Sequence, residues 1–147
     1  VQQIGKPQDV YEDPVNLFVA KFLGTPPINV FEGRISGGKL YIGGDAVMEY
    51  EDTEDQDVFV GIRPEGFILS ESGALSCKMS GIDVMGRDVS IVTTNAASCN
   101  PVVRSIIDAD NKVDPDTENV RYSLKPGKVY IFNKATEERI YAKGKAL

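Results

Sequence analysis

The chain has 147 residues, of which 41% are hydrophobic and 26% charged, so it is long enough to bury the core of one domain. Its net charge of −6 argues against nucleic acid or anionic lipid as a main partner, because phosphate groups are bound mostly by lysine and arginine. No apolar run approaches the roughly 20 residues that cross a bilayer, and no secretory signal is visible. The chain begins at Val1, and its first residues look like the end of a strand, so we expect a fragment of a longer protein.

The N-terminal part of the chain predicts a helix over residues 13–24. Asp13 suits the N-cap, Pro14 the first helical position and Gly24 the C-terminal stop. Apolar side chains recur at helical spacing and form one stripe. We expect this stripe, with Phe18 and Phe22 at its centre, to pack on the rest of the chain or on a second copy. Its members are Val15, Phe18, Val19, Phe22 and Leu23.

After Thr25-Pro26-Pro27 the pattern changes to short, β-rich segments separated by glycine, proline, aspartate and asparagine. Many short strands with turns between them are typical of a barrel or a sandwich. The expected strands are Val30–Ile35, Lys39–Ile42, Ala46–Tyr50, Val58–Arg63, Phe67–Leu69, Leu75–Val84, Asp88–Thr94, Val102–Ile107, Val120–Leu124 and Val129–Phe132.

The stretch GRISGGKL, residues 33–40, has the G-x-x-x-x-G-K spacing of a phosphate-binding loop. That loop needs a serine or threonine at its last position and a helix after it. Here Leu40 takes the last position, and a short β-rich run follows before Gly43-Gly44. The flanking residues alternate like strands, so we expect a β-hairpin with a glycine turn.

Two acidic stretches, residues 49–57 and 108–116, are interpreted as solvated loops because neither has the layout of a calcium-binding EF-hand loop. The chain has no histidine, and Cys77 and Cys99 are too far apart in sequence for a C-x-x-C metal motif, so we expect two thiols and no zinc. No serine or cysteine triad is visible either. We therefore expect no catalytic, cofactor-binding or metal-ligating residue in this chain.

Three stretches resemble one known family. Residues 3–29, QIGKPQDVYEDPVNLFVAKFLGTPPIN, are similar to the segment that ends the nucleotide-binding domain in ATPase subunits of carbohydrate-uptake ABC importers of the maltose-importer type. Residues 60–67, VGIRPEGF, resemble the G-I-R-P-E-H of the family's C-terminal domain, and residues 124–140 resemble its closing strand and following turn. This chain differs from the family at Lys6, at Gly66, where the family has histidine, and at Glu138, where we expect the turn glycine to belong.

The resemblance implies a mainly β chain with two parts. Residues 1–25 would be the helical remnant of the nucleotide-binding domain, and residues 26–147 an OB-like β-barrel regulatory domain of the TOBE type. ATP and Mg²⁺ would bind only in the upstream domain, which carries the family's true phosphate loop. The implied partners are a second copy of the subunit, transmembrane permease subunits reached through the ATPase domain, and a regulatory protein or small ligand. The implied location is the cytoplasmic face of the cell membrane.

Three functions fit this pattern. The first is a non-catalytic regulatory and dimerisation domain of a sugar-type importer ATPase. The second is a barrel that senses a small ligand, an oxyanion or a sugar. The third is an independent carbohydrate-binding module, which the absence of tryptophan disfavours. Arg63, Pro64 and Glu65 are the candidate motif of the barrel: they either brace one of its corners or take part in the subunit contact.

Overall fold

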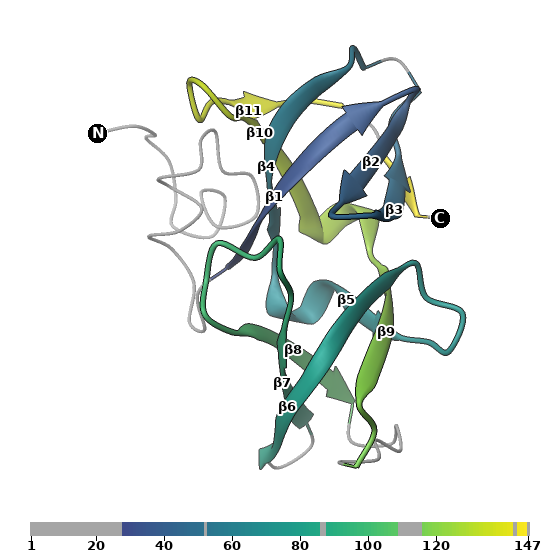
Figure 1. Ribbon diagram of the computed structural model, residues 1–147, viewed down its shortest axis with the longest axis vertical. Coiled ribbons are helices and arrows are strands. Elements are labelled where there is room, and N and C mark those ends of the chain that lie inside the picture. Colours follow the sequence, from purple (N-terminus) through teal and green to yellow (C-terminus); the bar gives the residue numbers. More distant parts are fainter. Residues whose placement is uncertain (1–27, 52, 86–87, 109–115, 143, 147) are drawn as a thin grey trace.

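A computed structural model describes residues 28–51, 53–85, 88–108, 116–142 and 144–146. Within these ranges the fold is mainly β, as Figure 1 shows. The strands are β1 (Asn29–Ser36), β2 (Lys39–Ile42), β3 (Asp45–Glu49), β4 (Gln56–Ile62), β5 (Phe67–Leu69), β6 (Leu75–Met85), β7 (Asp88–Thr94), β8 (Val103–Asp108), β9 (Asn119–Leu124), β10 (Val129–Asn133), β11 (Arg139–Ile140) and β12 (Lys145–Ala146). Two 3-10 helices, η1 (Pro64–Gly66) and η2 (Pro126–Lys128), interrupt them.

All ten expected strands are confirmed, with ends that agree to within two residues. The sequence did not indicate β11 and β12, because each has only two residues and is defined by a distant pairing partner. The helix expected over residues 13–24, including Phe18 and Phe22, lies outside the described residues.

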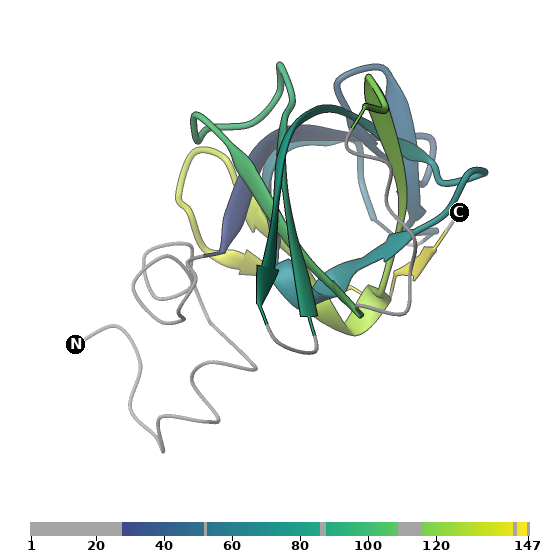
Figure 2. The same ribbon diagram turned by 90° about the horizontal axis from the view of Figure 1, so that it is seen from below.

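The strands form two antiparallel sheets that curve around one interior, seen end-on in Figure 2. The first has the order β11-β10-β4-β1-β2-β3-β12, and the second has the order β5-β9-β6-β7-β8. The two edge strands of the first sheet, β11 and β12, are consecutive in the chain, so the segment between them connects its two edges.

The two sheets exchange strands at two equivalent corners. The chain leaves β4, in the first sheet, through η1 and continues as β5 in the second. It returns from β9, in the second sheet, through η2 and continues as β10 in the first. Because β4 pairs with β10 and β5 pairs with β9, the two corners lie side by side.

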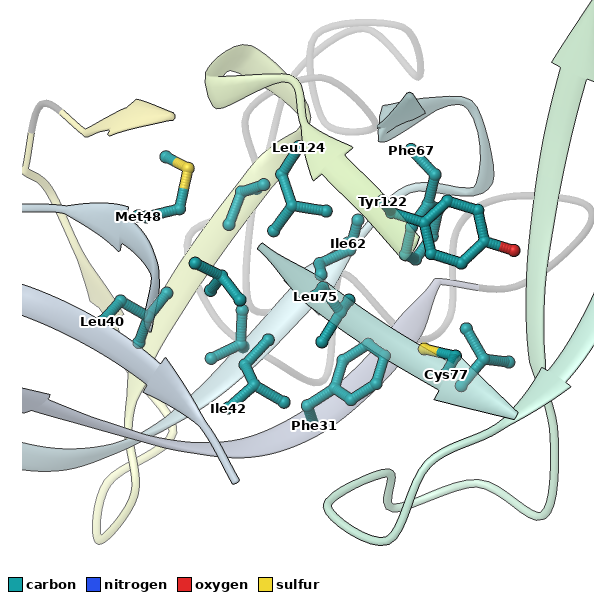
Figure 3. Close-up of a cluster of buried hydrophobic side chains, with 14 of the residues drawn as sticks. Phe31, Leu40, Ile42, Met48, Ile62, Phe67, Leu75, Cys77, Tyr122 and Leu124 are labelled. Atoms are coloured by element: carbon teal, nitrogen blue, oxygen red, sulfur yellow. The ribbon is translucent and has the colours of Figure 1, made fainter. Parts of the chain in front are cut away.

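One hydrophobic core fills the interior and draws residues from both sheets, as the close-up in Figure 3 shows. Its central members are Phe31, Leu40, Ile62, Phe67, Leu75, Tyr122 and Leu124, each at most 2% exposed. Burial of this apolar surface is the main stabilising contribution to the fold. A smaller cluster covers the opposite face of the first sheet and comprises Ile28, Val30, Tyr130 and Phe132, with Phe59 packed against it.

Beside its pairing with β4, β1 is hydrogen-bonded to the loop between β7 and β8 and to the start of β8. The amide of Glu32 donates to the Ala97 carbonyl at 2.8 Å, and the Cys99 amide donates to the Val30 carbonyl at 2.8 Å. Asn29, which is 4% exposed, donates through Nδ2 to the carbonyls of Ile62 at 3.1 Å and Arg104 at 2.8 Å. Its Oδ1 accepts from the Arg104 amide at 2.9 Å. One side chain therefore connects β4 to β8.

The hairpin expected for residues 33–40 is confirmed. Strands β1 and β2 pair from Gly33–Ile42 to Ser36–Lys39, which leaves Gly37 and Gly38 as a two-residue turn. Both glycines have positive φ, 60° and 75°, the conformation that a tight hairpin turn requires. Leu40 is fully buried in the core. A strand follows it rather than a helix, so this stretch does not form a phosphate-binding loop.

The turn between β10 and β11 corrects one sequence expectation. Asn133 Oδ1 accepts the amides of Ala135 at 2.9 Å and Thr136 at 3.0 Å. The chain then passes through Glu137 at φ 61°, a conformation that costs a residue with a Cβ roughly 1–2 kcal/mol. The position that calls for glycine is therefore Glu137, and the expectation of Glu138 was wrong by one residue.

Replacing Glu137 by glycine is expected to raise the free energy of unfolding by about 1 kcal/mol, because it removes the left-handed strain and breaks no side-chain contact in this exposed turn. Glu138→Gly is the matched control. It has no positive φ to relieve, and glycine there is expected to lower stability slightly. Chemical denaturation of the two variants measures the difference, and a larger gain from Glu138→Gly would contradict the assignment.

Candidate functional site

The paired corners η1 and η2 hold the motif residues that the sequence singled out. The Arg63 amide donates to the Lys128 carbonyl at 3.1 Å, and the Lys125 amide donates to the Gly66 carbonyl at 2.8 Å. Gly66 has no room for a side chain, because a Cβ there would lie 2.8 Å from the Cβ of Lys128. The glycine thus brings the two corners into direct contact.

Arg63, Pro64 and Glu65 occupy different environments within this corner. The Arg63 side chain is fully buried. Pro64 begins η1 and is also buried, at a bend where no ladder hydrogen bond is needed from its nitrogen. Glu65 is partly exposed and forms an ion pair with Lys128 at 3.8 Å, which links η1 to η2 across the surface. Two members of the motif, Arg63 and Pro64, are thus buried, and Glu65 lies at the surface.

A stack of arginine and tyrosine side chains extends from this corner to the surface. The Arg63 guanidinium carbon lies 5.6 Å from the centre of the Tyr130 ring, and that of Arg139 lies 4.8 Å from it. Arg139 also lies 4.7 Å from the centre of the Tyr141 ring. Tyr130 is buried, whereas Tyr141 is 65% exposed. Cation–π contacts therefore connect the buried motif arginine to an exposed aromatic ring.

Tyr141 lines a groove of about 480 Å³ between two parts of the first sheet. One wall is the end of β3 and the turn after it; the other is the segment that bridges β11 and β12. The lining residues are Glu49, Glu51, Thr53, Ile140, Tyr141, Ala142 and Lys145. The volume falls within the range typical of small-molecule sites.

Two buried tyrosines, Tyr50 beside the groove and Tyr122 in the core, have raised pKa values. Burial raises the pKa of Tyr50, which lies between the groove residues Glu49 and Glu51, to about 12, and the positive charge of Arg139 opposes part of this rise. Burial also raises the pKa of Tyr122 to about 12, against a hydrogen bond to Ser105 whose oxygen lies 3.0 Å from the phenol. Both phenols are neutral in the folded protein at pH values where an unfolded chain ionises.

Stability is expected to fall as the pH rises from about 10 to about 12. Below pH 10 both phenols are protonated in the folded and in the unfolded chain, so each makes its full contribution to the free energy of unfolding. Above pH 10 the unfolded chain loses the phenol protons first. The free energy of unfolding then falls by up to about 1.4 kcal/mol per pH unit for each tyrosine. Urea denaturation between pH 8 and pH 11.5 measures this slope. Tyr50→Phe is expected to remove its share of the slope, and an unchanged slope would contradict the assignment.

The remaining polar candidates form no metal centre within the described ranges. No group of three or more acidic, cysteine or histidine side chains there has a geometry suited to a metal ion. In the first acidic stretch, Asp55 Oδ1 accepts the Gly37 amide at 2.9 Å and so supports the hairpin turn. Most of the second stretch lies outside the described residues. Both cysteines are thiols, with Cys77 buried and Cys99 exposed.

Sequence reasoning missed Tyr130, Arg139 and Tyr141, together with the groove. Tyr130 and Phe132 were assigned to a strand, but not to one that is covered on both faces. A weak signal was present, because β10 reads as an uninterrupted apolar run instead of an alternating one. The groove depends on the pairing of β12 with β3, which no local pattern could predict.

Residues 29–67 match the family described as the CysA C-terminal regulatory domain. The match runs from the start of β1 through the first corner and includes Arg63, Pro64 and Glu65. Together with the relatives below, it confirms the resemblance seen in the sequence: the chain is related to the ATP-binding subunits of carbohydrate-type ABC importers.

Three curated relatives of this class match most of the chain. The sn-glycerol-3-phosphate import ATP-binding protein UgpC of Jannaschia sp. is 33% identical over 90% of this chain and 37% of that protein. The oligosaccharides import ATP-binding protein MsmX of Bacillus subtilis is 31% identical over 95% of the chain and 42% of that protein. The diacetylchitobiose uptake system ATP-binding protein MsiK of Streptomyces coelicolor is 26% identical over 95% and 43%. The chain thus spans about two-fifths of the length of these relatives.

Proposed function

We propose that this chain is the regulatory and dimerisation part of an ATP-binding subunit of a carbohydrate-type ABC importer, and that it has no catalytic activity of its own. The observation that carries the proposal is the match of residues 29–67 to a C-terminal regulatory domain, because this range builds the centre of the first sheet and the first corner. The OB type of the barrel is part of the same proposal. Its support is the strand exchange between two curved sheets at the two corners.

The absence of ATP chemistry in this chain is supported by the hairpin at residues 33–40. Its glycines form a tight turn, and Leu40 is buried where a phosphate loop would present a hydroxyl to Mg²⁺. In the proposed parent protein, ATP and Mg²⁺ bind in an upstream domain. Hydrolysis there drives import through permease subunits at the cytoplasmic face of the membrane. Among the described residues, no helix is long and apolar enough to span a membrane.

The proposed partner is a second copy of the same chain, related by a two-fold axis, which is the commonest symmetry of homo-oligomers. Full burial of Arg63 favours a bracing role for this side chain, so the surface of the corner would contribute Glu65 to any contact. Phe18 and Phe22 remain candidates for a second contact surface.

Light scattering across a concentration series, combined with titration of Mg²⁺-ATP, tests both halves of the proposal. The expected results are a concentration-dependent dimer and no ATP binding at millimolar nucleotide. Glu65→Ala and Phe22→Asp locate the contact, because only the variant at the interface should shift the dimer equilibrium. A strict monomer at the highest concentration would contradict dimerisation through this chain, and micromolar ATP binding would contradict the non-catalytic role.

Sensing of a small ligand is the second candidate function, and the groove beside Tyr141 favours it. Regulation through a ligand bound at this groove and dimerisation through another surface of the barrel are compatible with one another.

A further inference from the structure

The groove beside Tyr141 has the mixed lining of a site for a polar organic molecule. Glu49 and Glu51 supply carboxylates that only accept hydrogen bonds, and Lys145 supplies an ammonium that only donates them. Thr53 adds a hydroxyl, which does both. Ile140 and Ala142 supply apolar surface beside the exposed ring of Tyr141. A ligand with several hydroxyl groups would satisfy both kinds of partner at once.

The Tyr141 ring is held in place from within the fold. Arg139 lies against it at 4.7 Å and is itself stacked on the buried Tyr130. Since the ring is already in contact with one cation, a second cation would gain less from it and would be repelled by the first. The C–H groups of a sugar ring carry only small positive partial charges, so they could stack on an aromatic face without that repulsion.

The charges around the groove also favour a neutral ligand. Two carboxylates and one ammonium line it, which leaves one net negative charge, and Arg139 behind Tyr141 balances that charge. An anion, such as a phosphorylated sugar or an oxyanion, would meet two carboxylates. A dication would meet Lys145 and Arg139.

We propose that the groove between β3 and the β11–β12 segment binds a neutral carbohydrate, stacked on Tyr141 and hydrogen-bonded by Glu49, Glu51 and Lys145. The groove volume of about 480 Å³ suits a mono- or disaccharide. This inference names the ligand of the sensing role raised above. It rests on the groove and does not require the chain to dimerise.

The test is a titration of the 147-residue chain, followed by the amide signals of residues 49–53 and 140–145 in nuclear magnetic resonance spectra. The probes are cellobiose and maltose as neutral disaccharides, glucose 6-phosphate as an anion and putrescine as a dication. The expected result is that at least one disaccharide shifts the groove signals with a millimolar or tighter dissociation constant. The anion and the dication are expected to bind at least tenfold more weakly.

Variants at one position separate ring stacking from other causes. Tyr141→Ala is expected to weaken disaccharide binding at least tenfold, whereas Tyr141→Phe, which keeps the ring, should retain it to within about threefold. Glu51→Gln, which keeps the shape and loses the charge, is expected to weaken binding severalfold. Because Tyr141 and Glu51 are exposed, these variants should keep the cooperative thermal unfolding of the parent chain, with Tyr141→Ala lowered by only a few degrees through loss of the Arg139 contact, and this excludes misfolding.

Three outcomes would overturn the inference: no shift with either disaccharide, tightest binding of putrescine, or tightest binding of glucose 6-phosphate. Light scattering of the same samples reports dimerisation independently. A dimer that binds no saccharide would refute this inference and leave the dimerisation role standing, whereas a monomer that binds one would do the reverse.

Discussion

Replacing Gly73 by alanine is expected to lower the free energy of unfolding by at least about 3 kcal/mol, a large effect for a single methyl group. Gly73 lies in the loop between β5 and β6 and packs directly on the backbone of β9. A Cβ there would lie 2.6 Å from both the nitrogen and the oxygen of Tyr122. Backbone atoms cannot rotate away as a flexible side chain would, so the loop itself must move.

Movement of this loop would break two hydrogen bonds. The Gly73 amide donates to the Ser70 carbonyl at 3.0 Å, and Arg121 Nε donates to the Gly73 carbonyl at 2.9 Å. For a domain of this size the expected loss corresponds to a fall in melting temperature of roughly 6–12 °C. Gly44→Ala is the matched control, because Gly44 has no atom within 4 Å of an added Cβ and its φ is not positive. Equal melting temperatures for the two variants would contradict the close approach.

Replacing Asn29 by aspartate is expected to destabilise the chain by about 3 kcal/mol. The substitution preserves the shape of the side chain and the oxygen that accepts a hydrogen bond from the Arg104 amide at 2.9 Å. It removes the Nδ2 group that donates to the Ile62 and Arg104 carbonyls, and it places a charge at a site that is 4% exposed. The loss of a buried donor and the burial of a charge both cost free energy. At this position the change also removes the side-chain hydrogen bonds that connect β4 to β8.

Asn100→Asp is the control for this change. Asn100 lies beside Asn29 in the fold, where its Oδ1 accepts the Val30 amide at 3.2 Å. An aspartate oxygen can accept the same bond, and the residue is exposed, so we expect a change within about 0.5 kcal/mol. Urea denaturation of both variants gives the comparison. A cost for Asn29→Asp no larger than that for Asn100→Asp would show that the donated hydrogen bonds contribute little.

The strands could be predicted from the sequence because each one carries a local signal. Gly37-Gly38 marks a hairpin, and Pro64 and Pro126 mark bends between apolar runs. The pairing order could not be predicted in the same way. The pairing of β4 with β10 and of β9 with β6 joins residues far apart in the chain, and alternating apolar residues fit several partners equally well.

In the candidate site, too, only the features with a local sequence signal could be predicted. The sequence singled out Arg63 through a family motif, and Glu65 beside it, but composition and spacing could not show that one is buried and the other exposed. Tyr141 and Lys145 stand in a stretch without a clear pattern, and they become neighbours of Glu49 only through β12. The groove arises from the pairing of strands that are far apart in the chain, whereas the residues of the corner are recognisable as a local motif.

The two-residue strand β12 also has a consequence for the time course of folding. It pairs with β3, roughly a hundred residues earlier in the chain, and β4 pairs with β10 across about 70 residues. Topologies dominated by such distant contacts fold slowly, on the order of milliseconds to seconds. During synthesis, β3 and β4 therefore leave the ribosome well before residues 129–146. A chaperone that shields exposed strand edges would have most effect in that interval.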